Sequence, residues 1–151
     1  MQLSLNFDLN EFLQSNTAYD LGYILAVDDW TLEQLKRLVA TVLQPIRREL
    51  GESIMITSGY RPPWLNHLIR GSKDSRHMYG LAADWHPVAM PLDIAFQRVK
   101  QMNLPIDQLI LETLQGKSWI HVGIAFPGTE PRQQYMTAVD KPGGGVTYKN
   151  V

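Results

Sequence analysis

The stretch SRHMYGLAAD, residues 75–84, places His77 and Asp84 seven residues apart, with Gly80 and small side chains between them. Both residue types bind metal ions, and the segment between them can turn tightly and then run extended. A buried histidine beside an unrelated surface carboxylate would leave the same pattern. The stretch therefore predicts a metal site only if a third ligand, a base and a substrate-binding cation occur elsewhere.

A third ligand candidate, His121, lies in the run WIHVGIAF. Because side chains alternate along a strand, Ile120 and Val122 define an apolar face and His121 points to the other one. Two imidazoles and one carboxylate suit a catalytic zinc ion, with a fourth position left for water. The chain has no cysteine, so any metal must be held by nitrogen and oxygen ligands, which manganese, cobalt and nickel also accept. We expect one zinc ion. Taken alone, His121 is more typical of an ordinary hydrogen-bonded histidine.

A general base is needed beside such a metal, and Glu112 is the natural candidate. It ends the run DQLILE, which precedes the strand of His121. A hairpin centred near Gln115 and Gly116 would put Glu112 opposite Trp119, on the same face as His121. Without that geometry, Glu112 would be an ordinary carboxylate at a strand end.

The elements that must position these residues follow from hydrophobic spacing. Apolar residues at helical intervals predict a helix over Leu32–Leu50, ended by Gly51 and kinked or divided at Pro45. Further helices are expected in DLNEFL, with Asp8 and Glu11 as a capping pair, and over Pro91–Met102. Strands are expected at 53–57, 81–86, 107–112 and 119–126, and as an edge strand in QYMTAV.

Helices come first along the chain and adjacent strands later, which favours an α+β fold. We expect a mostly antiparallel sheet with helices packed on one side. The predicted organisation is a single domain over residues 1–140, followed by a flexible C-terminal tail over 141–151, KPGGGVTYKNV. The loop TLQGKS is expected to make a longish connection between the last two strands of the site.

Composition limits the classes of function. The 151 residues are 44% hydrophobic and 19% charged, which is typical of one folded domain and excludes a disordered chain. Fourteen basic and fifteen acidic side chains give a net charge of −1, so no nucleic-acid partner is predicted. No apolar run approaches the roughly 20 residues that cross a bilayer, so we expect no membrane insertion.

Four motifs occur in the order SGYRPPWLN, SRHMYGLAAD, DQLILE and WIHVG. In this order they resemble the zinc D-Ala-D-Ala carboxypeptidase and L-alanyl-D-glutamate peptidase superfamily. The similarity is closest to its hedgehog-like branch, which is common among phage and bacterial cell-wall hydrolases. The segments LSLNFDLNEFLQSNTA and VLQPIRREL also resemble that branch, so the likeness spans roughly residues 3–125.

The resemblance implies roles for individual residues. His77, Asp84 and His121 match the zinc ligands, and Glu112 matches the catalytic base of the branch in which that residue ends the preceding strand. In other branches the base lies three residues before the last ligand, where this chain has Ser118. Since a serine cannot serve as that base, the assignment depends on Glu112.

Substrate contacts are implied in the same way. Arg61, in SGYR, matches an arginine that holds a substrate carbonyl or carboxylate, a role suited to a permanently charged, two-pronged guanidinium. Ser75 matches a serine that hydrogen-bonds substrate, and Trp119 is a further candidate beside the site. Tyr60 and Trp64 could line a substrate groove, but aromatic residues beside prolines are more often packing residues.

Two other histidines need an interpretation. His86 follows Asp84 on the same strand face, where the family pattern more usually continues with aliphatic residues. It could be exposed, support a ligand or contact substrate, and we favour one of the first two roles. His67 lies on a predicted short helix and is interpreted as a surface residue.

The leading hypothesis is a zinc metallopeptidase that cuts an amide in the peptide part of peptidoglycan, as an endolysin-like or carboxypeptidase-like enzyme. One alternative is a non-catalytic, zinc-containing module that recognises cell wall or a protein, in which His86 would fill the fourth metal position. Another is a virion component with a vestigial site. The intact set of ligands, base and arginine argues against loss of activity.

The expected cellular setting follows from the N-terminal segment. MQLSLNFDLNEF lacks the basic and apolar regions of a secretory signal, so we expect synthesis in the cytoplasm. Action on the cell wall would then require release, as in phage or prophage lysis, and otherwise the protein would stay cytoplasmic. We expect a monomer with peptidoglycan peptide as its partner. The sequence leaves the bond that is cut open.

Overall fold

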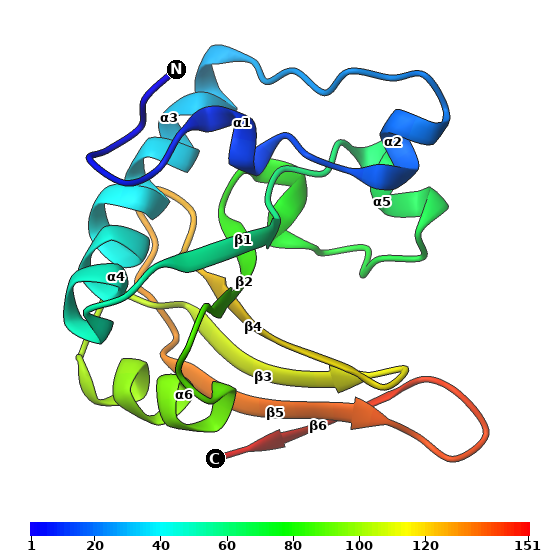
Figure 1. The fold of residues 1–151 in the computed structure, drawn as a ribbon. Helices are drawn as coiled ribbons and strands as arrows, with labels where there is room; N and C mark the ends of the chain where they lie inside the picture. The colour runs from blue at the N-terminus through cyan, green and yellow to red at the C-terminus, as the bar shows by residue number, and fades with distance from the viewer.

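A six-stranded sheet forms the frame of the molecule (Figure 1). The computed structural model describes residues 1–151, and its strands lie in the order β1-β2-β4-β3-β5-β6. Every neighbouring pair is antiparallel except β3 and β5. The expected α+β class with a mostly antiparallel sheet is therefore confirmed. The strands are β1 (Ile54–Ser58), β2 (Ala82–Pro87), β3 (Gln108–Leu114), β4 (Lys117–Gly123), β5 (Gln134–Asp140) and β6 (Val146–Asn150).

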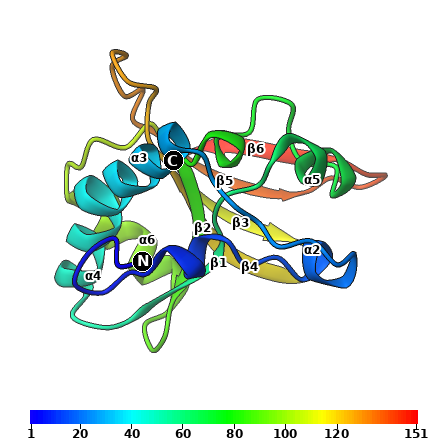
Figure 2. The ribbon, with the colours of Figure 1, turned by 90° about the horizontal axis from the view of Figure 1, so that it is seen from above.

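The longer helices gather on one side of the sheet, whereas the short α2 and α5 lie together toward its other end (Figures 1 and 2). None of the helices combines the length and the apolar character that crossing a bilayer requires. The helical segments are α1 (Leu9–Phe12), α2 (Asn16–Asp20), α3 (Asp29–Leu38), η1 (Val39–Leu43), α4 (Gln44–Leu50), α5 (Pro63–Leu68), η2 (Arg76–Tyr79) and α6 (Leu92–Gln101).

The helix predicted over Leu32–Leu50 is divided just before Pro45, as expected. The segment η1 is a π-helical stretch that joins α3 to α4, and Pro45 lies in the first turn of α4. Proline has no N–H, and its ring crowds the carbonyl four residues earlier, so a widened turn relieves the clash. Gly51 ends α4 in the left-handed conformation (φ 70°), as predicted. The capping pair of Asp8 and Glu11 at α1 is confirmed as well.

The connection between β3 and β4 is shorter than expected. Only Gln115 and Gly116 separate the two strands, and both have positive φ values of 51° and 73°. This is the geometry of the two-residue turns that match the twist of a hairpin. The register that follows pairs Glu112 with Trp119 and Ile110 with His121, so the predicted facing of Glu112 and Trp119 is confirmed.

The C-terminal region differs from the expectation. The run QYMTAV forms β5, but β5 is not an edge strand, because it lies between β3 and β6. The segment 141–151 is not a flexible tail, since Val146–Asn150 pairs with β5 along its length. The run Gly143–Gly145 has positive φ throughout. It forms the hairpin turn between β5 and β6, at a place where a flexible tail was predicted.

The main hydrophobic core lies between the helices and one face of the sheet. Alternate strand residues such as Ile120, Val122 and Leu109 enter this core and are completely buried. Trp85 from β2 belongs to it too, and α6 contacts β2, β3 and β4 across it. The residues between these positions point to the opposite face, where the predicted chemical groups lie.

Candidate metal centre

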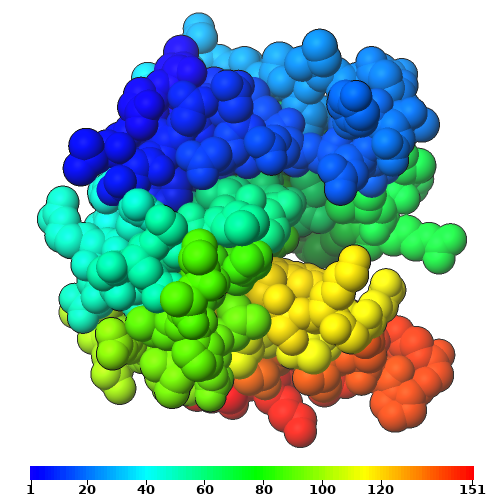
Figure 3. Space-filling model, in the orientation of Figure 1, coloured from blue at the N-terminus to red at the C-terminus, as the bar shows by residue number.

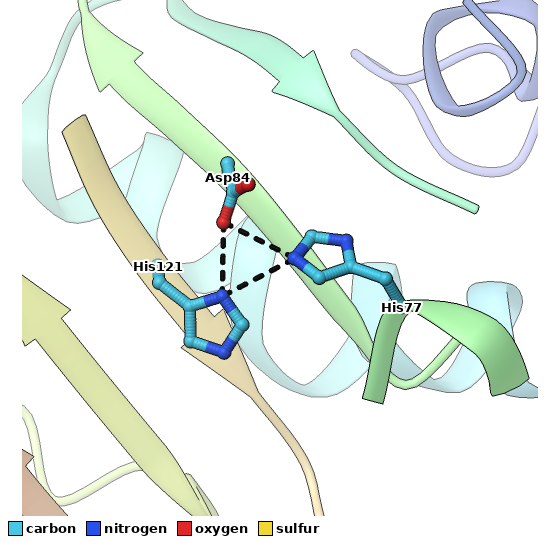
Figure 4. Close-up of side chains that lie close together, drawn as sticks. All are labelled: His77, Asp84 and His121. Atoms are coloured by element: carbon cyan, nitrogen blue, oxygen red, sulfur yellow. Dashed lines mark hydrogen bonds and ion pairs between the residues drawn. The ribbon is translucent and has the colours of Figure 1, made fainter. Parts of the chain in front are cut away.

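His77, Asp84 and His121 converge on one point at the opposite face of the sheet (Figure 4). Asp84 on β2 and His121 on β4 are directly paired in the sheet, and His77 reaches them from η2. Oδ1 of Asp84 lies 2.9 Å from Nδ1 of His121 and 3.2 Å from Nε2 of His77. The two ring nitrogens are 3.3 Å apart. Residues far apart in the chain thus form one compact ligand group.

The spacing of these atoms fits a single small cation. Ligands bound to zinc at about 2.0–2.1 Å in tetrahedral geometry lie about 3.3 Å from one another. The three ligand atoms here are separated by 2.9, 3.2 and 3.3 Å. Two imidazoles and a carboxylate are also a donor set that zinc accepts. The group could therefore hold one metal ion without a change of side-chain position.

The orientation of His77 is set by its second ring nitrogen. Nδ1 donates to the carbonyl oxygen of Gly59 at 2.7 Å, which leaves the lone pair of the neutral ring on Nε2, facing the group. Such a hydrogen bond behind a ligand fixes its tautomer and direction. Gly59 itself is confined, because an added Cβ would lie 2.5 Å from the Cα of Phe12. Burial lowers the pKa of His77, which favours the neutral form that binds metal.

Asp84 stays ionised between the two rings. Burial alone would raise the pKa of this carboxyl group, but the influence of the flanking His77 and His121 outweighs burial and holds the pKa far below its usual value. Gly80 precedes the strand in the left-handed conformation (φ 66°). A Cβ at this position would approach the carbonyl oxygen of Thr31 to 2.8 Å, so the tight turn behind the group requires glycine.

A pocket of about 770 Å³ opens onto the three residues. Figure 3 shows the surface hollowed between the green segment that contains α5 and the yellow β3–β4 hairpin. Glu112, Trp119, Arg61 and Ser75 all line this pocket. The structure therefore brings together, in one pocket, the four residues that the sequence predicted as base and substrate contacts.

Glu112 lies in an environment that favours its protonated form. Burial raises the pKa of this carboxyl group. The nearby His121 opposes the shift, the negative charge of Asp84 adds to it, and Arg61 opposes it. A carboxylate with a raised pKa accepts and releases a proton more readily at neutral pH than an exposed one.

Arg61 is held against the metal group by its own backbone. Its N–H donates to the carbonyl oxygen of His77 at 3.1 Å. Its side-chain Nε is buried and has no hydrogen-bond partner within the protein. Burial lowers the pKa of the guanidinium, and the negative charges of Asp84 and Glu112 oppose that shift. A buried donor without a partner is uncommon in proteins and calls for an explanation, and the Arg61 side chain lines the pocket.

The remaining predicted residues lie outside the site. Nδ1 of His86 is 3.1 Å from the carbonyl oxygen of Pro87, and His86 does not belong to the metal-ligand group. His67 is exposed on α5, as expected. Trp64 packs against Tyr23, with ring centroids 4.9 Å apart. Neither Trp64 nor Tyr60 lines the pocket, so their interpretation as packing residues holds.

The C-terminal strands contribute a wall of the pocket that the sequence reasoning missed. Trp119, Glu112, Ala138 and Tyr148 are paired in a row across β4, β3, β5 and β6. The small, fully buried Ala138 leaves space between Glu112 and Tyr148. Burial and the charge of Glu112 both raise the pKa of Tyr148. The alternation within QYMTAV and GVTYKN was the available signal, but it did not reveal which strands are neighbours.

The chain belongs to the peptidase M15 family, whose pattern it matches over residues 5–123. The matched segment includes all three members of the metal-ligand group. Peptidases of this family depend on zinc, so the match supports a metallopeptidase. The strands β5 and β6 lie beyond the matched segment. No curated protein matches the chain significantly.

Proposed function

We propose that the protein is a zinc-dependent peptidase that hydrolyses an amide bond in the peptide part of peptidoglycan. The observation that carries the proposal is one pocket in which a His-Asp-His group, a buried carboxylate and a buried guanidinium lie together. Membership of the M15 family supports the reaction type. The order of the four sequence motifs, which resembles cell-wall peptidases, supports the substrate.

His77, Asp84 and His121 would hold the zinc ion through Nε2, Oδ1 and Nδ1, respectively. When bound, zinc polarises a carbonyl group and lowers the pKa of a water molecule toward neutrality. The three side chains supply two neutral donors and one negative charge, which leaves a bound dication with net positive charge. That charge would attract the carbonyl or carboxylate oxygens of a peptide to the centre of the pocket.

Glu112 acts as the general base and acid. It takes a proton from the attacking water and passes it to the amine that leaves, so one carboxyl group serves both steps. Its raised pKa brings these two transfers closer in energy at neutral pH. Trp119 is paired with it across the hairpin and lines the same pocket.

Arg61 stabilises the negative charge that develops on the substrate. Its buried, unpartnered Nε and its terminal nitrogens can donate to the carbonyl oxygen during attack, or to a nearby carboxylate. Its backbone N–H is hydrogen-bonded to His77, which fixes the main chain of Arg61 next to a proposed metal ligand. Ser75, at the start of η2, donates a further hydrogen bond to the peptide.

The setting in which such an enzyme would meet the wall is also part of the proposal. The protein acts after release from the cytoplasm, as in phage or prophage lysis, and works as a monomer on wall peptides. Lysis assays in cells whose inner membrane is permeabilised would test this. Cell lysis that requires permeabilisation supports the proposal, and lysis without it contradicts it.

Digestion of purified sacculi, followed by mass spectrometry of the released peptides, tests the enzymatic activity. We expect new free amines with zinc, none after treatment with a chelator, and recovery when zinc is restored. The variant His67→Gln should give the same three results as the wild type, since His67 is an exposed histidine outside the pocket. Zinc-loaded protein that releases no peptide from any sacculus or soluble muropeptide would overturn the proposal.

A further inference from the structure

One end of the pocket is lined by two arginines that the proposed reaction does not use, Arg76 and Arg132. Both face a single carboxylate, that of Asp107, whose side chain is almost completely buried beneath them. Arg132 donates from Nε and from one terminal nitrogen to this carboxylate, with distances of 3.0, 3.1 and 2.6 Å. Arg76 lies farther away, at 3.6 Å.

The arrangement leaves positive charge without a partner. One carboxylate neutralises one of the two guanidiniums, and each guanidinium carries five N–H donors. The second terminal nitrogen of Arg132 has no acceptor within the protein, and Nε of Arg76 is buried without one. Two further residues of opposite charge, Arg70 and Asp74, also line the pocket and add no net charge to it. This end of the pocket therefore keeps one net positive charge.

Packing holds Arg76 in place, and hydrogen bonds to Asp107 hold Arg132, whose side chain is 46% exposed. The guanidinium of Arg76 lies 4.4 Å from the ring centre of Phe126, and the side chain is only 23% exposed. The backbone N–H of Arg132 donates to the same Asp107 carboxylate at 3.0 Å. A guanidinium that is fixed before a ligand arrives loses little freedom on binding, which favours two-pronged recognition of a carboxylate.

The subsite lies at a defined separation from the metal group. Asp107 is three residues before Ile110, and Ile110 is paired with His121. Three residues of a strand span about 10 Å, and an extended peptide covers that distance with about three residues. Gln108 and Gln134, which are hydrogen-bonded to each other at 3.1 Å, line the pocket between the two places.

We propose that Arg76 and Arg132 form a carboxylate-binding subsite, so that the preferred peptide carries a free carboxylate about two or three residues from the bond that is cut. The inference rests on the proposed function for the position of that bond. It names the substrate class more narrowly: acidic peptides whose carboxylate is not amidated.

Binding measured by calorimetry tests the subsite without any turnover. The protein used is the zinc-loaded Glu112→Gln variant, and the probe is the tetrapeptide L-Ala-γ-D-Glu-L-Lys-D-Ala. Two further probes have either the glutamyl or the C-terminal carboxylate converted to the amide. One of the two amides should bind about tenfold more weakly than the parent, because a charge-assisted hydrogen bond is lost.

The arginines are then removed one at a time in the same background. In Arg76→Gln and in Arg132→Gln the preference for the carboxylate should fall below about threefold, because the charge that it binds is gone. Arg98→Gln removes an exposed arginine of α6 and should keep the full preference. Arg132 lies just before β5 and is bonded to the buried Asp107, so its replacement could unfold the protein. Melting curves identify any variant that unfolds. If Arg132→Gln is unfolded, the carboxylate preference measured in Arg76→Gln alone tests the subsite.

Two results would overturn the inference: equal affinities for all three peptides, or a preference that survives in Arg76→Gln. A surviving preference that disappears with the chelator would assign the carboxylate to the metal. Cleavage of the parent peptide by the wild-type enzyme is scored separately. A binding preference without cleavage would contradict the proposed function alone, and cleavage without a preference would contradict the subsite alone.

Discussion

The two faces of the strand β4 lie in different environments, one in the hydrophobic core and one in the pocket. Ile120 and Val122 point into the core and are completely buried among apolar side chains. Trp119 and His121, one residue away in each case, point into the pocket with the metal-ligand group. The same seven-residue strand thus contributes to the stability of the fold on one side and to its chemistry on the other.

The contrast shows that burial has opposite consequences on the two faces. On the apolar face, removal from water stabilises the protein in proportion to the area buried. On the site face, removal from water raises the energy of charged groups, so each one is paired or has a shifted pKa. Asp84 remains charged because two histidines flank it, whereas the pKa of Glu112 is raised. Substitutions on the two faces should therefore separate cleanly into effects on folding and effects on activity.

The largest expected effect is on the site face. Glu112→Gln removes the proposed general base but keeps its shape, so cleavage of muropeptides should fall by about 100- to 10,000-fold. Zinc content and melting temperature should stay at wild-type values, since Glu112 is not one of the three ligand residues. Rates come from mass spectrometry of timed digests, and zinc content from elemental analysis. Turnover like that of the wild type would exclude Glu112 as the base.

On the apolar face, Ile120→Ala should lower the free energy of unfolding by about 2–5 kcal/mol, because it leaves a cavity in a fully packed core. Activity per folded molecule should change little. Urea denaturation followed by tryptophan fluorescence gives the stability. Lys117→Ala, at an exposed position of the same strand, is the control and should stay within about 0.5 kcal/mol. A large loss of activity in folded Ile120→Ala would mean that the two faces are not separable.

A third test measures how the free energy of unfolding depends on pH. The contribution of the apolar face should not change with pH, whereas that of a paired carboxylate should. Burial alone would raise the pKa of Asp107, but hydrogen bonds from Arg132 and the charges of Arg132 and Arg76 lower it below its usual value. A carboxyl group with a depressed folded-state pKa stabilises the fold above its unfolded pKa of about 3.9, and that contribution is lost as the pH falls through the folded-state pKa.

The stability difference between the wild type and Asp107→Asn should therefore be full at neutral pH and shrink below about pH 4. Urea denaturation over a pH series measures it. The difference between the wild type and Ile120→Ala should stay constant over the same series. A gap for Asp107→Asn that is equally constant would show that the ion pair with Arg132 contributes nothing to folding.

The smallest effect is expected at the far end of the site face. Tyr148→Phe removes only a hydroxyl group from the pocket wall, so kcat/KM should fall by about fivefold, the loss expected if this hydroxyl donates one hydrogen bond to the substrate. The melting temperature should not change, because the ring remains. Tyr19→Phe, on an exposed tyrosine of α2, is the matched control. An unchanged kcat/KM in Tyr148→Phe would mean that only β2, β3 and β4 contribute residues to catalysis on this face.

Local patterns predicted the centre of the site well. Alternation along WIHVGIAF indicated that His121 faces away from the core, and the hairpin near Gln115 indicated that Glu112 lies opposite Trp119. Both inferences depend on neighbours within about ten residues, where strand periodicity and turn geometry decide the outcome. The helix division at Pro45 is of the same kind.

What the sequence could not supply were contacts between distant segments. No local feature of QYMTAV reports that it will run parallel to β3, because a crossover can lead to either edge of a sheet. The glycines in KPGGGVTYKNV are compatible with a loose tail and with a hairpin turn, and only pairing with β5 selects the turn. The shared partner of Arg76 and Arg132 was hidden for the same reason, since Asp107 lies more than twenty residues from either.

The two-residue turn at Gln115 and Gly116 has a consequence for how this protein can vary. Because side chains alternate, inserting one residue into β4 would send His121 inward and Ile120 outward in the same step. Fold and chemistry would then be lost together, with no intermediate that keeps either. Change by substitution can treat the two faces separately, whereas change in length cannot, so insertions in homologous chains should be confined to loops outside the β3–β4 hairpin.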